Sequence, residues 1–261
     1  MNRKNQPRQR VRGFVRTWEK PSGECWNLCA DILKQPHTLI AGATGSGKSV
    51  LINSLIYTAL YSAPCEVGFI LIDPKRVELV EYAELPHTFI YACEPVDILR
   101  AIRTAVNLME NRCREMQRLR QKESTEPHMY IIVDEFADLM TTQKDQVLKP
   151  LCRIAQLGRA AHIHLIAATQ RPTRDIINGQ IKVNIDSRVA LRCPTAQDSR
   201  NIINTKGAEA LPRVGFGYYL TPDTMKPQLV NIPYTEPAEL HRLIDWWEKQ
   251  NRRSIFDRFK R

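Results

Sequence analysis

Eight consecutive residues carry the spacing Gly-x-x-x-x-Gly-Lys-Ser, which is that of a phosphate-binding loop. In such a loop the backbone N–H groups surround the phosphates of a nucleotide, while the lysine reaches the β and γ oxygens and the serine holds Mg²⁺. A β-prone run at 37–41 precedes the loop, and an apolar helical pattern at 50–60 follows it, as this loop requires. The segment predicts binding of a nucleoside triphosphate by Gly42, Ala43, Thr44, Gly45, Ser46, Gly47, Lys48 and Ser49.

A second acidic motif follows a buried-strand pattern at 130–133. Asp134 and Glu135 come directly after this run. An aspartate at the tip of such a strand can hold Mg²⁺ through water, and an adjoining glutamate can polarise the attacking water. The alternative is that these acids cap the next helix. Together with the phosphate loop, the pair favours ATP hydrolysis, with Asp134 as a metal ligand and Glu135 as the general base.

Continuous apolar runs alternate with amphipathic helical patterns along most of the chain. The runs predict strands at 38–41, 67–72, 129–133, 163–168 and 188–191. The periodic patterns predict helices near 96–119, 144–156 and 237–250, and an edge hairpin is expected at 218–231. Such alternation indicates an α/β fold with a mostly parallel sheet and helices on both faces.

The net charge of +10 comes almost entirely from the two ends of the chain. Residues 1–16 hold six basic side chains and no acid, and residues 249–261 hold six basic side chains and one acid. This leaves 26 basic and 27 acidic residues in 17–248, so the body is close to neutral. Basic arms can bind nucleic acid by releasing its counterions, or they can be disordered, solubilising tails. The charge alone leaves both interpretations open.

Hydropathy and cysteine spacing exclude several classes. No apolar run reaches the roughly 20 residues that span a bilayer, and the N-terminus has no signal-peptide core. The seven cysteines are scattered, and only Cys25 and Cys29 lie close together, without the partners that would complete a zinc site. We therefore expect reduced thiols and a cytoplasmic protein without an integral membrane segment.

Several stretches together resemble the FtsK/SpoIIIE family of double-stranded-DNA translocases. They are Ala41–Val50 (AGATGSGKSV), Ile72–Leu79 (IDPKRVEL), Leu85–His87 (LPH), Val133–Met140 (VDEFADLM), Gly158–His164 (GRAAHIH), Ala168–Pro172 (ATQRP), Asp198–Arg200 (DSR) and Gly207–Leu211 (GAEAL). The resemblance runs from about residue 35 to 220, with the motifs in the family's order. Many proteins share the phosphate loop. The stretches VDEFADLM and ATQRP, preceded by an Asp-Pro-Lys that follows the phosphate loop, are much more specific to the family.

The resemblance implies roles for residues whose chemistry alone is ambiguous. Gln170 matches the polar sensor that reads the γ-phosphate in the same subunit. Arg159 matches an arginine finger that reaches the nucleotide of the neighbouring subunit, an interaction that can raise the rate by several powers of ten. Arg153 and Arg171 remain alternatives for the finger. The turn at 73–75, Asp-Pro-Lys, lies near the nucleotide site and the interface in the family, and its role stays open.

For the whole chain, the resemblance implies a RecA-like P-loop NTPase core that assembles as a ring, with a hexamer expected, and moves double-stranded DNA. It divides the chain into a basic arm at 1–16, a motor domain at 17–235, and a C-terminal amphipathic helix with a basic tail at 236–261. Septal members carry membrane helices, a linker and a winged-helix module, none of which fits this sequence. The chain is more similar to compact motors of conjugative elements, plasmids and phages. This similarity implies DNA transfer or mobilisation, with a relaxase or another part of a transfer machinery as a partner.

Two other classes of function are weighed against the translocase. Protein-secretion ATPases of the type VII kind share the motor fold, but they usually carry several ATPase modules and a membrane anchor. A small-molecule kinase or a switch GTPase fits less well, because the guanine-reading Asn-Lys-x-Asp is missing and no arginine-rich lid follows the core. ATPase stimulation by duplex DNA would separate the first class from the others.

Overall fold

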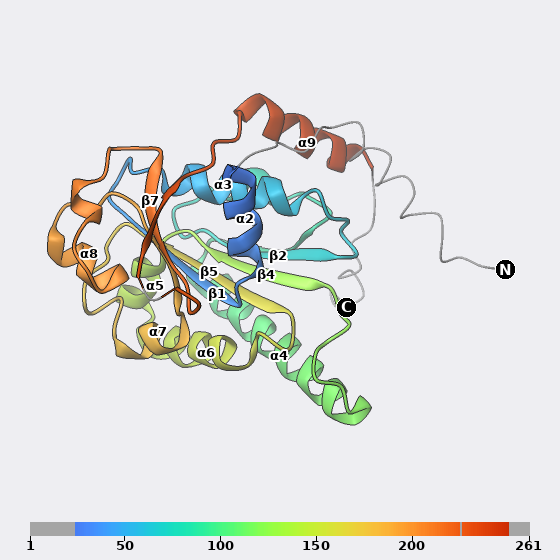
Figure 1. Cartoon of the computed structure of the whole chain (residues 1–261). Helices are drawn as coiled ribbons and strands as arrows, with labels where there is room; N and C mark the ends of the chain where they lie inside the picture. The colour runs from blue at the N-terminus through green and yellow to red at the C-terminus, as the bar shows by residue number, and fades with distance from the viewer. Residues whose placement is uncertain (1–23, 225, 251–261) are drawn as a thin grey trace.

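An eight-stranded sheet runs through the middle of the molecule, in the order β3-β2-β4-β5-β1-β6-β7-β8 (Figure 1). This computed structural model describes residues 24–224 and 226–250. The parallel strands are β1 (His37–Ala41), β2 (Val67–Ile72), β3 (Thr88–Ala92), β4 (His128–Val133), β5 (Ile163–Thr169) and β6 (Ser187–Ala190). The antiparallel strands are β7 (Phe216–Leu220) and β8 (Gln228–Asn231). The parallel strands all end on one side of the sheet, called here its carboxyl end, and begin on the opposite side, its amino end.

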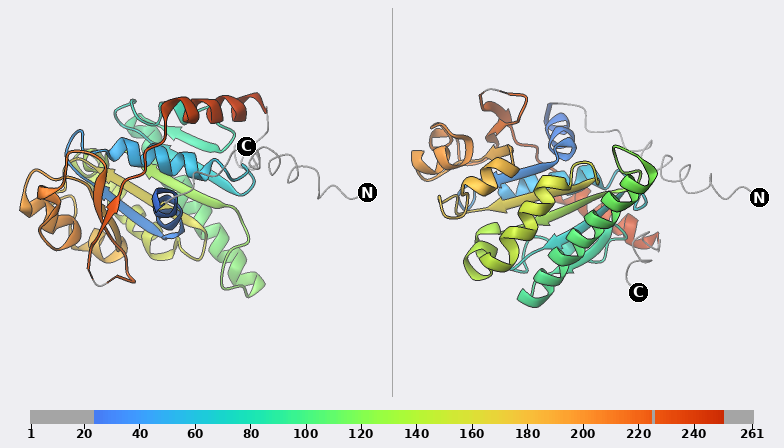
Figure 2. Two further views of the ribbon diagram at one scale, coloured as in Figure 1. Left: turned by 45° about the horizontal axis from the view of Figure 1, so that its top comes forward. Right: turned by 90° about the horizontal axis from the view of Figure 1, so that it is seen from below.

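Helices cover both faces of the sheet (Figure 1, Figure 2). One face carries α2 (Glu24–Lys34), α3 (Lys48–Ala59), α9 (Pro237–Lys249) and the short 3-10 helix η1 (Val80–Tyr82). The other face carries α4 (Pro95–Leu119), α5 (Phe136–Thr142), α6 (Lys144–Leu157) and α7 (Gly179–Asn184). Beside β6 lie α8 (Ala196–Ile203) and the 3-10 helix η2 (Ala208–Ala210).

The side chains of the central strands alternate between two hydrophobic cores. On β1, Leu39 and Ala41 belong to the core under α4–α7, whereas Ile40 belongs to the core under α3 and α9. On β4, Ile131 and Ile132 divide in the same way. Because both faces of these strands are buried, most of their positions are apolar, and the strands appear in the sequence as nearly continuous apolar runs.

The α/β fold with a mostly parallel sheet is confirmed. The predicted strands correspond to β1, β2, β4, β5 and β6, and the predicted hairpin corresponds to β7 and β8. The predicted helices correspond to α3, α4, α6 and α9. The sequence patterns did not indicate β3, α2, α5, α7 or α8, which are mostly short elements. The arm at 1–16 and residues 251–261 of the basic tail lie outside the described residues, and the domain boundaries stay predictions.

The last helix packs firmly on the body of the protein. Trp247 of α9 is buried, and its Nε1–H donates to the backbone oxygen of Leu60 at 2.9 Å. Its ring meets the ring of His87 edge to face, with centroids 4.6 Å apart. The helix therefore completes the core over α3.

Candidate nucleotide-binding site

The phosphate loop lies at the carboxyl end of the sheet, between β1 and α3. Gly45 and Gly47 have φ angles of 71° and 97°, a region that L side chains rarely adopt. A Cβ at Gly42 would come within 2.6 Å of Ser46 Oγ and 2.7 Å of Leu191 Cβ, which is closer than atoms can pack. The shape of the loop thus requires glycine at all three positions.

The lysine of the loop meets the first acid of the second motif. Lys48 Nζ donates to Oδ1 and to the backbone oxygen of Asp134, each at 3.0 Å. The side chains of Lys48 and Asp134 are only 4% and 1% exposed. Burial raises the pKa of Asp134 above its ordinary value, and the nearby Lys48 ammonium opposes that shift. The fold has brought together two groups that are 86 residues apart in the chain.

Glu135 is surrounded by hydrogen-bond donors. Its Oε1 accepts from Thr169 Oγ1 at 2.7 Å and from the Gln170 backbone N–H at 3.2 Å. Its Oε2 accepts from Lys75 Nζ at 3.1 Å and from the same Gln170 N–H at 3.3 Å. Burial alone would raise the pKa of Glu135, but the Thr169 hydroxyl, the Lys48 charge and the contacts from Lys75 and Gln170 hold it below its ordinary value. The side chain is therefore an ionised carboxylate at neutral pH.

Gln170 joins the tip of β5 to the phosphate loop. Its side-chain Oε1 accepts from Thr44 Oγ1 at 2.8 Å, while its backbone N–H is bonded to Glu135. A residue in this position contacts both the loop that would surround the phosphates and the carboxylate that would activate water. Its role as a γ-phosphate sensor stays a prediction, and this placement is compatible with it.

The turn at 73–79 has a well-defined structure that the sequence left open. The fully buried Asp73 carboxylate accepts four backbone N–H groups, at 3.2 Å (Lys75), 2.9 Å (Arg76), 3.1 Å (Glu78) and 3.0 Å (Leu79). Arg76 takes a φ of 59°, and its guanidinium pairs with Glu94 just before α4. Asp73 thereby organises the turn and directs Lys75 toward Glu135.

Arg159 lies at the opposite, amino end of the sheet. It is exposed and precedes β5, whose seven residues span roughly 20 Å before Gln170 is reached. The two alternatives are also exposed: Arg153 on α6 has its Nε 3.8 Å from Glu110 Oε1, and Arg171 follows Gln170 at the carboxyl end. Arg159 is too far from the phosphate loop of its own chain to touch a nucleotide there.

The turn that carries Arg159 is held by contacts from neighbouring elements. The backbone N–H of Ser124 donates to Ala160 O at 2.8 Å, and the buried Arg112 guanidinium donates to Ala161 O at the same distance. These contacts fix the backbone beside Arg159, so the position of the turn is set by the body of the protein.

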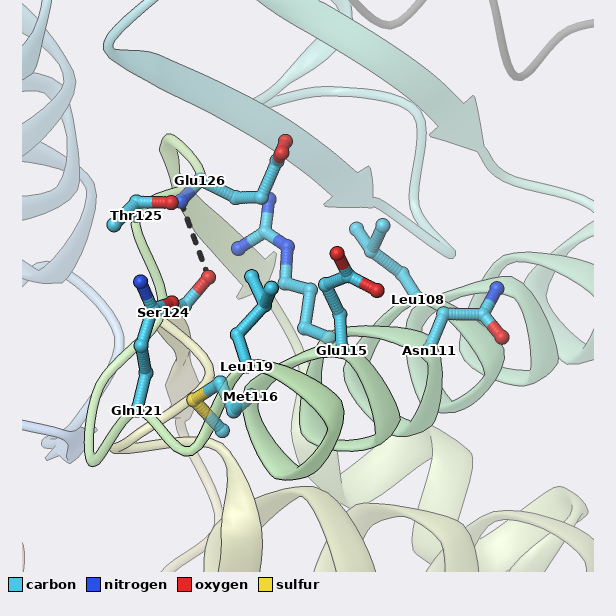
Figure 3. Close-up of a pocket in the computed structure, with 10 residues that line it drawn as sticks. Leu108, Asn111, Glu115, Met116, Leu119, Gln121, Ser124, Thr125 and Glu126 are labelled. Atoms are coloured by element: carbon cyan, nitrogen blue, oxygen red, sulfur yellow. Dashed lines mark hydrogen bonds between the residues drawn. The ribbon is translucent and has the colours of Figure 1, made fainter.

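A cavity of about 220 Å³ adjoins this turn, between the end of α4 and the loop that precedes β4 (Figure 3). Figure 3 shows Met116 and Leu119 of α4 facing Gln121 and Ser124 of that loop. The cavity lies at the amino end of the sheet, so it is separate from the phosphate loop.

A larger cavity of about 370 Å³ opens directly beside the phosphate loop. Its lining comprises Ala43, Thr44, Gly45, Ser46, Arg192, Cys193, Pro194, Glu209 and Arg213. The Arg213 guanidinium lies against Gly45, since its Nη2 would be 3.2 Å from a Cβ built there. The cavity thus presents two arginines next to the loop.

The residues present fit a nucleotide with Mg²⁺. The Ser46 hydroxyl is buried in the loop without a hydrogen-bond partner, as expected of a group shaped to meet a ligand. No group of three or more His, Cys, Asp or Glu side chains that could hold a metal occurs in the described ranges. Proteins usually bind Mg²⁺ through one or two side chains together with substrate phosphates. Ser49 and Asp134 are the residues that would hold it.

Comparison with known proteins identifies the family of the chain. The sequence model of the FtsK/SpoIIIE family matches residues 21–131 and 116–174. The chain belongs to the FtsK/SpoIIIE family. The DNA translocase FtsK of Chlorobaculum tepidum is 39% identical over 241 residues, and the alignment covers 84% of this chain and 30% of that protein. The FtsK of Helicobacter pylori is 37% identical over 235 residues, with 84% and 28% covered. The chain thus spans about 30% of the length of these FtsK relatives.

Solved structures share the P-loop ATPase motor fold of this FtsK/SpoIIIE member. The pCW3 conjugation coupling protein TcpA, in its monomer form with ATPγS, superposes with a TM-score of 0.72 at 23% identity over 83% of this chain and 66% of that one. The cytoplasmic domain of the Thermomonospora curvata type VII secretion ATPase EccC gives a TM-score of 0.68 at 22% identity, with 83% and 28% covered. At these identities the likeness establishes the fold alone.

The structure adds residues to the candidate site that sequence patterns did not single out. Thr169 bonds Glu135, Lys75 pairs with Glu135, and Arg213 covers Gly45. A threonine at a strand end carries no distinctive signal by itself. The polar strand tip at 169–170, next to an acidic tip on the neighbouring strand β4, is the pattern that would have pointed to Thr169.

Proposed function

We propose that this chain is the ATPase motor of a double-stranded-DNA translocase. The observation that carries the proposal is the meeting of Lys48, Asp134 and Glu135 at the carboxyl end of the sheet, with Gln170 joining them to the loop. Open α/β sheets bind ligands at this end, where the helix after β1 also offers its N-terminus to phosphates.

Each residue has a distinct task in the proposed hydrolysis. Lys48 leaves Asp134 for the phosphates when nucleotide enters. Ser49 and Asp134 would hold Mg²⁺, which would supply positive charge next to the phosphate oxygens. Glu135 accepts a proton from water as the water oxygen bonds to the terminal phosphorus and the bond to the bridging oxygen breaks, which releases ADP and phosphate. Gln170 is the proposed sensor of that terminal phosphate, and its contacts with Thr44 and Glu135 support this role.

Duplex DNA is the proposed substrate, because the curated relatives are named DNA translocases. Local charge supports this choice. Residues 171–213 hold eight basic and four acidic side chains, whereas the body as a whole is close to neutral. This segment includes α7 and α8 and adjoins the nucleotide site, so DNA bound there would lie near the chemistry. The basic arms at the two ends are the second candidate for DNA contact.

The proposed assembly is a ring, with a hexamer as the expected number of copies. Arg159 lies far from the phosphate loop of its own chain, so it can act as a finger only on the nucleotide of a neighbouring copy. A ring would bring that pair together. DNA transfer or mobilisation, with a relaxase or another transfer protein as a partner, completes the proposal. The proposed location is the cytoplasm, because the scattered spacing of the seven cysteines predicts reduced thiols. Within the described ranges, no helix is long and apolar enough to cross a membrane.

The deciding experiment measures ATP turnover with three candidate activators. Linear duplex DNA should raise the rate, whereas single-stranded DNA of equal length and an export-signal peptide should not. Stimulation by the peptide alone would replace the translocase with the secretion class, whose motor fold the chain shares. A rate that none of the three changes would contradict DNA translocation while leaving ATP hydrolysis intact.

A second experiment locates the residues that bind DNA. Removing one protein–phosphate interaction lowers the slope of log affinity against log salt by about 0.9 for duplex DNA. Deletion of 1–16 or 250–261 should reduce that slope by several units if the arms carry the binding. Substitution of Arg171 and Arg174 by alanine should reduce it by about two units if the segment at 171–213 does. An unchanged slope after a deletion would show that this arm is a solubilising tail.

A further inference from the structure

Three donors contact the Glu135 carboxylate in the described part of the chain. Thr169 bonds Oε1, Lys75 bonds Oε2, and the Gln170 backbone N–H is shared between the two oxygens. A general base must accept a hydrogen bond from the water that it activates. On Oε2 the Lys75 ammonium is the one of these donors that is not shared, so it competes with such a water for that oxygen.

The three donors differ in how easily they can leave. Thr169 is fully buried, so breaking its contact would strand a hydroxyl and a charge away from water. The Gln170 donor is a backbone N–H at the tip of β5, fixed by the strand. Lys75 is 41% exposed on its side chain, so water can replace Glu135 as the partner of its ammonium. The Lys75 contact costs least to open.

We propose that Lys75 is a positioning residue that holds Glu135 in a resting arrangement and restrains ATP hydrolysis until it swings away. Release of Lys75 frees Oε2 on the solvent side, where a water molecule can enter, while Thr169 and Gln170 keep the carboxylate oriented. This inference rests on the proposed function and adds a device to it: activation by DNA or by a neighbouring copy works by drawing Lys75 off Glu135.

The turn at 73–79 is built to present this side chain. Asp73 anchors the backbone from inside the protein through its four N–H contacts. Arg76, the next residue after Lys75, faces outward and pairs with Glu94. Lys75 and Arg76 thus carry the same charge on one turn, and only Lys75 contacts the catalytic carboxylate. Arg76 therefore provides a matched control.

The test compares ATP turnover of the full chain with and without saturating duplex DNA in Lys75→Met, Lys75→Arg and Arg76→Gln. Methionine removes the charge and keeps the length, so basal turnover should rise about fivefold, which corresponds to about 1 kcal/mol for a partly exposed ion pair. The ratio of stimulated to basal turnover should fall by the same factor. Lys75→Arg restores the charge and should therefore reverse most of the rise, whereas Arg76→Gln, the control outside the site, should keep the wild-type basal rate.

The restraint of Glu135 by Lys75 is called here the latch. Two further measurements distinguish the loss of this latch from a change in nucleotide binding or in folding. The affinity for a fluorescent ATP analogue and the melting temperature of Lys75→Met should match those of the wild type. Adding Glu135→Gln to Lys75→Met should remove the increase, because the extra turnover passes through that carboxylate.

The outcomes distinguish this inference from the proposed function. Basal turnover of Lys75→Met that equals or falls below that of the wild type overturns the latch, even where DNA stimulates the wild type normally. A rise in Lys75→Met, with no effect of DNA on any variant, supports the latch and contradicts DNA activation. A rise of the same size in Arg76→Gln would show that charge on the turn matters in general, and it would overturn the specific role of Lys75.

Discussion

Replacing Thr169 with valine tests whether the hydrogen bond that orients Glu135 is needed for hydrolysis. The Thr169 hydroxyl is fully buried, and its oxygen lies 2.7 Å from Glu135 Oε1. Valine keeps the shape of the side chain and removes this donor, so Oε1 keeps only the N–H that it shares with Oε2. A hydrogen bond to a charged group contributes about 1.5–3 kcal/mol. If the orientation is needed in the transition state, kcat should fall by about 10- to 150-fold.

The assay combines steady-state ATP turnover, binding of a fluorescent ATP analogue and urea unfolding. ATP affinity should change less than about twofold, because Thr169 contacts the phosphate loop only through its backbone oxygen, which accepts from Gly42 N–H at 3.2 Å and is unchanged by the substitution. The free energy of unfolding should fall by about 1–3 kcal/mol. Thr38→Val is the matched control: Thr38 is also buried in the sheet, and its hydroxyl donates to Ser187 Oγ at 3.2 Å, at the amino end. This variant should be less stable by about 1 kcal/mol and fully active. Thr169→Val with kcat within twofold of the wild type would refute the argument that this hydrogen bond sets the carboxylate for catalysis.

Three further predictions follow from the site and its surroundings. Glu135→Gln should bind ATP with Mg²⁺ and stall, and turnover near the wild-type rate would show that another group is the base. Arg159→Ala subunits alone should lose DNA-stimulated turnover, but mixing them with Lys48→Ala subunits should restore part of it; no recovery in mixed assemblies of folded subunits would move the finger to another arginine. Burial lowers the pKa of His37 to about 3 and that of His164 to about 4, so both are neutral when folded, whereas the unfolded chain takes up protons near pH 6.5. The free energy of unfolding should therefore fall between pH 6.5 and 4, by about 1.4 kcal/mol per pH unit for each of these histidines. Replacing both with glutamine should make the urea-unfolding profile less steep in pH, while the buried His87, whose pKa is also lowered to about 4, keeps its own contribution.

The sequence predicted the elements whose hydrophobic pattern is long or continuous. The 25 residues of α4 repeat one apolar stripe, and β2 and β4 are unbroken apolar runs, so local pattern was enough. The sequence pattern did not predict strand β3, because two of its five residues are half-buried at the border of the sheet and the apolar pattern is weaker there. Short helices such as α5 and α7 have too few turns to show a period.

The residues of the candidate site also fall into two groups, those that the local sequence predicts and those that it does not. Contiguous motifs located the phosphate loop and the acidic pair before any fold was known. The contacts that set the behaviour of Glu135 come from Lys75, 60 residues earlier, and Thr169, 34 residues later. The local sequence does not specify which side chains meet at the carboxyl end of the sheet, because the order of the strands in the sheet differs from their order in the chain. The placement of Arg159 at the far end of β5 likewise required the direction of the strand.

The two borders of the sheet matter for a protein that is proposed to meet copies of itself. An open sheet leaves unpaired backbone N–H and C=O groups on its outer strands, and such strands can join the sheets of other molecules and start aggregation. In the described part of the chain these outer strands are β3 and β8, with only five and four residues. Pro86 lies shortly before β3, while Pro227 and Pro233 bracket β8, and a proline has no N–H with which to extend a ladder. In the proposed ring, short and proline-flanked borders would let copies of the chain lie close together while their backbones stay separate, so that contact between them would be left to side chains.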